Sequence, residues 1–146
     1  VLSKIELQSR AEIRYEGYVK QINIEAKTMI DIASKQIRPA VVKYAGEVAQ
    51  SVAALKAVGV DASAEEELLN EINHNLKLFH ERLKMLAEVT EQAGLLKGDS
   101  KSQAIFYRDY VFQAMKELRE PADQLEMLVD ENAWPFPTYG ELLFNI

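Results

Sequence analysis

Apolar residues recur over the first 57 residues at the spacing of one helix face. From Tyr15 to Leu55, eleven steps cover forty residues, about 3.64 residues per step, which matches an α-helix better than a strand or a coiled coil. The pattern therefore predicts a long amphipathic helix over residues 1–57 that buries one face. That face carries Tyr15, Val19, Ile22, Ala26, Met29, Ala33, Ile37, Val41, Tyr44, Val48, Val52 and Leu55.

Pro39 interrupts this first helix, because proline lacks a backbone N–H and its ring crowds the preceding turn. The apolar stripe nevertheless continues in phase from Ile37 to Val41. We therefore expect a kinked helix, or two nearly coaxial helices, with the bend at residues 36–38. A plain helix end at Pro39 is the alternative.

Three capping-box patterns mark helix starts at residues 3–6, 63–66 and 100–103, where a serine is followed three residues later by Glu or Gln. The second predicted helix, residues 63–94, is closed by Gly94 and buries Leu69, Ile72, Leu76, Phe79, Leu83, Leu86, Thr90 and Ala93. The third, residues 100–132, buries Ala104, Tyr107, Val111, Met115, Leu118, Ala122, Leu125 and Val129.

The connections between these helices are short, so neighbouring helices should run antiparallel. Pro121 predicts a kink or a restart of the third helix near Arg119. The fold class predicted from the pattern is therefore all-α: an antiparallel bundle of three to four long helices in a single domain over residues 1–146. The first and third helices are expected to be kinked or broken at their prolines.

The last stretch, residues 133–146, differs in character from the helices. It holds four of the twelve aromatic residues of the chain, and two prolines enforce an extended entry. Such a tail should dock its aromatic side chains on the bundle or on a neighbouring chain. The candidate interface residues are Trp134, Phe136, Tyr139, Leu142, Leu143 and Phe144.

Composition limits the classes of function. The net charge is −6, distributed as +3 over residues 1–60 and −9 over residues 61–146. An acidic chain that has no basic patch with interleaved aromatic residues is a poor candidate for nucleic-acid binding. We expect neither membrane insertion nor export, because there is no long apolar run and no signal-peptide pattern. The lack of cysteine suits a cytoplasmic protein. A start at Val1 without an initiator Met suggests a segment of a longer protein.

Catalytic chemistry is mostly missing from the sequence. Glu71 and His74 have the Glu-x-x-His spacing of di-metal helical bundles, but the spacing occurs once and both residues flank the apolar seam, which favours a solvent-exposed helix surface. His80 is likewise interpreted as a histidine on a helix surface and not as a functional site. We find no phosphate-binding loop, no nucleophile with its base and no HExxH motif, so no catalytic, cofactor-binding or metal residue is assigned.

Three passages taken together resemble the type III glutamine synthetases. They are VLSKIELQSR at residues 1–10 with RYE at 14–16; INIEA, MIDIA and QIRPA at residues 22–26, 29–33 and 36–40; and LEMLVD at residues 125–130 with WPFPTYGELLF at residues 134–144. The last passage is the most specific. Because the resemblance runs through the whole chain in order, the chain is identified as the C-terminal region of such an enzyme.

The resemblance implies a full-length cytoplasmic enzyme that joins ammonia to glutamate, using ATP and Mg²⁺ or Mn²⁺. It also implies two partners for this region: the catalytic domain of the same chain and neighbouring subunits of a ring-shaped homo-oligomer. The ligands of ATP, metal and glutamate lie upstream, so the region itself is expected to be inactive, with a structural, assembly or regulatory role. The alternatives are a free-standing helical interaction module and, with less support, a di-metal bundle.

Overall fold

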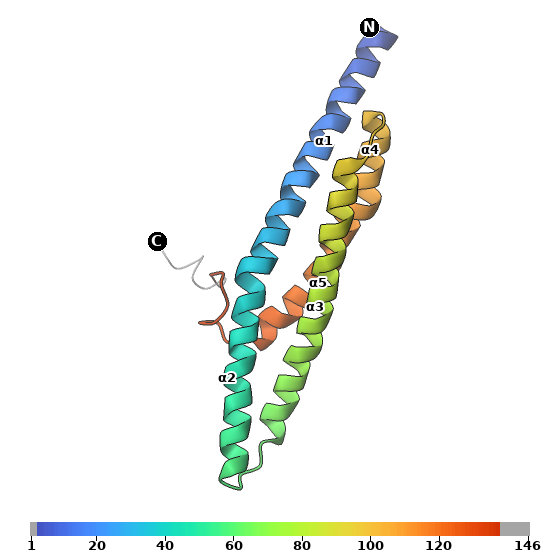
Figure 1. The fold of residues 1–146 in the computed structure, drawn as a ribbon. Helices are drawn as coiled ribbons and strands as arrows, with labels where there is room; N and C mark the ends of the chain where they lie inside the picture. The colour runs from blue at the N-terminus through green and yellow to red at the C-terminus, as the bar shows by residue number, and fades with distance from the viewer. Residues whose placement is uncertain (1–2, 138–146) are drawn as a thin grey trace, which may run out of the picture. The chain divides into compact units, whose positions relative to one another are not determined.

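A computed structural model describes residues 3–137 of the chain. Over this range the structure is helical with short connections and no strand, which confirms the predicted all-α helical bundle (Figure 1). The elements are α1 (Lys4–Ile32), the π-helical turn η1 (Ala33–Ile37), α2 (Arg38–Ala57), α3 (Ser63–Leu95), α4 (Ser100–Phe106), the π-helical turn η2 (Tyr107–Val111) and α5 (Phe112–Leu128).

The chain groups into two compact units. Unit 1 comprises Val1–Asp31 and Arg82–Leu118, and unit 2 comprises Ile32–Glu81 and Arg119–Ile146. The expectation of a single domain over residues 1–146 stays a prediction.

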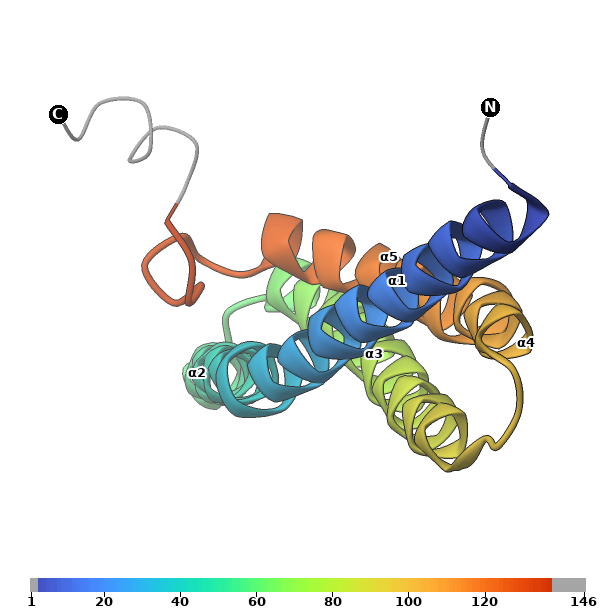
Figure 2. The ribbon, with the colours of Figure 1, turned by 90° about the horizontal axis from the view of Figure 1, so that it is seen from above.

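Unit 1 is built from α1, the second half of α3, and the succession of α4, η2 and the start of α5. The chain direction in Figure 1 shows that α3 runs antiparallel to α1 and to α4 here, and Figure 2 shows the short loop that joins α3 to α4. Arg82 of α3 donates to Glu117 of α5 over 2.5 Å. The core of this unit contains Ile22, Ala26, Leu83, Leu86, Thr90, Ala93, Ala104, Tyr107, Val111, Met115 and Leu118.

Unit 2 is built from η1, α2, the first half of α3 and the last turns of α5. α2 is followed by Gly59, whose φ of 77° is a left-handed conformation that glycine adopts at little cost, and Val60 N–H then donates back to the Leu55 carbonyl over 3.0 Å. Lys56 and Glu66 form an ion pair across the following turn. The core of this unit contains Ala33, Ile37, Val41, Val48, Ala62, Ile72, Phe79, Pro121, Leu125 and Val129.

The apolar faces predicted for the three long helices face inward. Every residue assigned to these faces is buried or half-buried in the structure, including the least apolar one, Thr90. Its hydroxyl donates to the Leu86 carbonyl over 2.6 Å, so the polar atom is satisfied within its own helix. The helical period of the sequence therefore located the core in both units.

Neither proline ends its helix, so the alternatives of a helix end at Pro39 and a restart near Arg119 are wrong. Before Pro39 the turn widens into η1, where the Arg38 N–H donates to the Ala33 carbonyl five residues back. The wider turn accommodates the ring and the missing donor of proline. Pro121 lies fully buried inside α5 without such a turn.

Only the first of the three predicted capping boxes forms as expected. Ser3 N–H donates to Glu6 over 2.7 Å, and the Ser3 hydroxyl accepts from Glu6 N–H over 3.3 Å. These bonds favour the ionised carboxylate and lower the pKa of Glu6.

The other two predicted capping boxes are displaced by aspartates that precede the serines. Asp61 accepts from the N–H and the hydroxyl of Ser63, over 3.1 and 3.0 Å. Asp99 is the N-cap of α4 and accepts from Ser102 N–H over 2.8 Å, which lowers the pKa of its carboxyl. Aspartate is as good a cap as serine, and its charge also suits the positive end of the helix.

The third long helix ends at Leu128, four residues before the expected end at residue 132. Asp130 explains the early end. Its carboxylate accepts from Asn132 N–H over 2.8 Å, and its carbonyl accepts from Ala133 and Trp134 N–H over 2.9 and 3.0 Å. This turn starts the segment that leads to the tail.

Candidate functional site

The described part of the predicted interface consists of two aromatic residues in unit 2. Trp134 and Phe136 are half-buried, and their rings meet edge to face, with centroids 6.5 Å apart and an interplanar angle of 66°. This is a favourable geometry for an aromatic pair. The other predicted interface residues, Tyr139, Leu142, Leu143 and Phe144, lie outside the described residues.

The residues weighed as metal ligands lie on the outside of α3. Glu71, His74 and His80 are all exposed, and Glu71 and His74 line a shallow surface hollow together with neighbours on the same helix. Among residues 3–137, no three carboxylate or imidazole side chains come close enough together to hold a metal ion.

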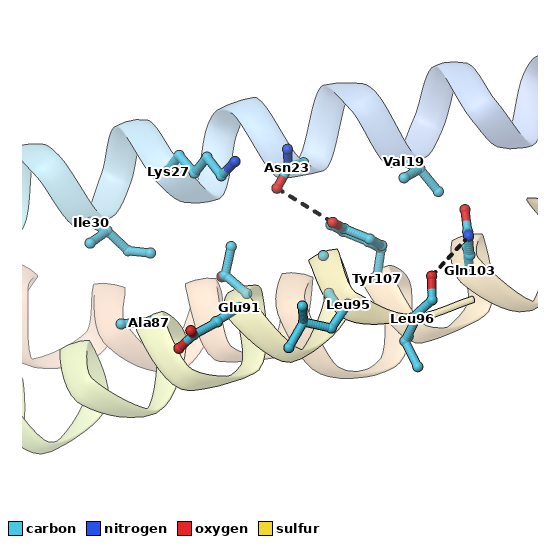
Figure 3. Close-up of a pocket in the computed structure, with 13 residues that line it drawn as sticks. Val19, Asn23, Lys27, Ile30, Ala87, Glu91, Leu95, Leu96, Gln103 and Tyr107 are labelled. Atoms are coloured by element: carbon cyan, nitrogen blue, oxygen red, sulfur yellow. Dashed lines mark hydrogen bonds between the residues drawn. The ribbon is translucent and has the colours of Figure 1, made fainter. Parts of the chain in front are cut away.

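A concave site of unit 1 lies between α1, the end of α3 and the α4–η2 segment, and we call it the unit 1 hollow (Figure 3). It has a volume of about 650 Å³, which is within the usual range of small-molecule sites. Its lining residues are Val19, Asn23, Lys27, Ile30, Ala87, Thr90, Glu91, Ala93, Gly94, Leu95, Leu96, Gln103 and Tyr107.

Four neutral polar side chains line the hollow: the amides Asn23 and Gln103, the phenol Tyr107, and Thr90, whose hydroxyl donates to the Leu86 carbonyl. The Tyr107 hydroxyl donates to the Asn23 side-chain oxygen over 3.4 Å, and Gln103 Nε2 donates to the Leu96 carbonyl over 3.2 Å (Figure 3). Burial disfavours the phenolate and raises the pKa of Tyr107, so the hydroxyl stays a donor at neutral pH. The Asn23 amide nitrogen and the Gln103 side-chain oxygen take no part in these two bonds.

Opposite charges stand on opposite walls of the hollow. Lys27 extends from α1 and Glu91 from α3 in Figure 3, and both side chains are exposed. Within the part of the chain that the structure describes, neither of them has an ion-pair partner. The hollow therefore presents a cation and an anion at the edges of a mainly apolar surface.

Sequence reasoning placed Tyr107 on a buried face but did not find this hollow. Asn23 and Tyr107 are separated by 84 positions in the chain, and the polar wall residues have no common spacing. The π-helical turn η2, which carries Tyr107, leaves no local pattern that could have served as a signal.

A separate finding concerns membranes: within residues 3–137, no helix combines the length and the apolar character that crossing a bilayer requires.

Comparisons with known proteins give a consistent result. The family described as "Glutamine synthetase C-terminal domain" matches residues 1–56. The chain is 31% identical to the type-3 glutamine synthetase of Dictyostelium discoideum, 30% to a glutamine synthetase of Butyrivibrio fibrisolvens and 28% to one of Bacteroides fragilis (strain YCH46). These similarities cover 99%, 100% and 99% of this chain but only 20%, 21% and 21% of the respective relatives.

The chain thus spans about a fifth of the length of the relatives it matches, while nearly all of its own residues take part in each similarity. The predicted resemblance to type III enzymes is confirmed over the whole chain and not only over the three passages. The chain belongs to the glutamine synthetase family, as the C-terminal domain of such an enzyme.

Proposed function

We propose that this chain is the non-catalytic helical part of a cytoplasmic enzyme that joins ammonia to glutamate with ATP. The observation that carries the proposal is the match over 99–100% of this chain to about one fifth of each glutamine synthetase. ATP and Mg²⁺ or Mn²⁺ would be held by the remainder of the enzyme. Among residues 3–137, no cluster of side chains is arranged to hold such an ion.

The test compares the chain with the longer protein that contains it. We expect the purified 146-residue chain to form no glutamine from glutamate, ammonia, ATP and Mg²⁺, whereas the longer protein forms glutamine under the same conditions. Product that survives repurification of the short chain would contradict the non-catalytic role. A longer protein that folds and binds ATP but forms no glutamine would contradict the proposed reaction.

The second part of the proposal concerns partners. Trp134 packs against the chain's own helices, and the segment after Pro137 contacts the catalytic part or a neighbouring subunit of a ring-shaped homo-oligomer. Two observations support it: Trp134 and Phe136 are already half-buried and paired with each other, and the rest of the apolar tail follows directly in sequence. Aromatic and aliphatic side chains gathered in one short segment present an apolar surface that is stabilised by docking.

Removing residues 138–146 from the longer protein should reduce ring assembly, measured as molar mass by light scattering during size-exclusion chromatography. The same deletion in the 146-residue chain should leave helicity and melting temperature nearly unchanged, because the proposal gives this segment a partner outside the helices of the chain. As a narrower variant, Leu142, Leu143 and Phe144 are replaced together by alanine.

The matched control for this variant replaces Glu141 and Asn145 by alanine, which changes the same segment without removing apolar contacts. Rings that form normally while the shortened 146-residue chain unfolds would show that the tail belongs to intramolecular packing, and the partner role would then be wrong.

A further inference from the structure

The unit 1 hollow has the charge pattern of a site for a zwitterion. Lys27 and Glu91 line it from different helices, and both lack an ion-pair partner within the described residues. A small ligand that carries both a carboxylate and an ammonium group would complement these two charges. Charge-assisted hydrogen bonds of this kind are stronger than bonds between neutral groups.

The neutral groups of the hollow add a second requirement. The Asn23 amide nitrogen is a spare donor and the Gln103 side-chain oxygen a spare acceptor, because their other amide atoms bind Tyr107 and the Leu96 carbonyl. A ligand group that both donates and accepts fits this pair, and a primary carboxamide does so with one planar group. Val19, Ile30 and Leu95 supply apolar contact for the carbon chain between the two ends.

The backbone around Tyr107 is also unusual. η2 is a single π-helical turn, in which the Phe112 N–H donates to the Tyr107 carbonyl five residues back. Such turns are often found at functional sites, where they place a side chain that a regular helix would direct elsewhere. Here the turn starts at the residue whose hydroxyl fixes the Asn23 amide at the wall of the hollow.

We propose that the unit 1 hollow binds a free α-amino acid with a carboxamide side chain, such as glutamine. Lys27 binds the ligand's carboxylate, Glu91 binds its ammonium group, and Asn23 and Gln103 bind the carboxamide. Binding rests on this hollow alone, whereas a role in sensing the reaction product rests on the proposed function of the enzyme.

The binding test is isothermal titration calorimetry on the 146-residue chain with three probes. L-glutamine carries all the recognised groups, glutaramic acid lacks the ammonium group, and 4-aminobutanamide lacks the carboxylate. We expect glutamine to bind in the millimolar range or tighter. Each shortened probe should bind about tenfold or more weakly, since one charge-assisted interaction is lost.

Two variants assign the charged groups to their sites on the ligand. The Glu91→Gln substitution should weaken glutamine binding about tenfold. The variant should then bind glutamine and glutaramic acid with equal affinity, because the partner of the ammonium group is gone. Lys27→Met should likewise bind glutamine and 4-aminobutanamide equally. The matched controls Lys20→Met and Glu16→Gln alter exposed residues of α1 outside the hollow, and they should bind glutamine as the unchanged chain does.

Three results would overturn the proposal: no heat of binding with glutamine at the solubility limit, equal affinity for all three probes, or unchanged affinity in both hollow variants. Far-UV circular dichroism and melting of every variant show that each is folded before titration. The outcome is independent of ligase activity. Glutamine binding by the chain together with an inactive longer protein would contradict the proposed function alone, and an active enzyme without binding here would contradict the hollow alone.

Discussion

Replacing Phe79 by alanine is expected to lower the free energy of unfolding by about 3–5 kcal/mol. The ring of Phe79 is 0% exposed in the core of unit 2. Its removal loses the burial of a large apolar surface and leaves a cavity that the neighbouring helices close only in part. Urea unfolding followed by circular dichroism measures the effect as a lower midpoint with an unchanged slope.

The matched control is Met127→Ala, since Met127 is a large apolar residue of the same unit with 82% of its surface exposed. It should change the free energy of unfolding by no more than about 0.5 kcal/mol. Leu83→Ala applies the same reasoning to unit 1 and should cost about 2–5 kcal/mol. An unchanged midpoint for Phe79→Ala would mean that the apolar seam of α3 does not face the core.

The helices and their buried faces were predictable because each depends on residues close together in sequence. The stripe through Ile22 and Val41 has the helical period, and the period alone decides which side chains turn inward. The helix starts at residues 63 and 100 were also located correctly, but the contacts that cap them were not. A serine with an acidic or amide residue three positions later fits a capping box, but Asp61 accepts from the Ser63 N–H, and Asp99 caps α4 through the Ser102 N–H.

The π-helical turns and the unit 1 hollow were not predictable in this way. A π-helical turn adds one residue to a helix, and the step from Tyr107 to Val111 equals other steps of the same stripe, so the sequence gives no sign of it. The hollow depends on side chains such as Asn23 and Glu91, which come from different helices and meet only after packing. Polar residues near an apolar stripe are also common on ordinary helix surfaces.

The extra residue of η2 leads to a further expected result: deleting Asp109 should leave the chain folded. A π-helical turn holds one residue more than the α-helical turn it replaces, so the deletion can convert η2 into α-helix while Met115 and Leu118 keep their inward orientation. Asp109 is exposed, and its interaction with Arg108 is between adjacent surface residues, which contributes little to stability. Helicity and cooperative urea unfolding should therefore be retained.

The matched control for Asp109 is deletion of Lys77, an exposed polar residue within α3, which contains no π-helical turn. Without an extra residue to absorb the loss, the helix on one side of the deletion turns by about 100° relative to the other. Ile72 and Phe79 then cannot both face the core of unit 2. The cooperative transition should disappear and helicity should fall, as measured by circular dichroism and urea unfolding.

If both deletions abolish folding equally, η2 does not act as a removable insertion. If both deletions are tolerated, folding does not depend on the apolar face of α3 pointing toward the core.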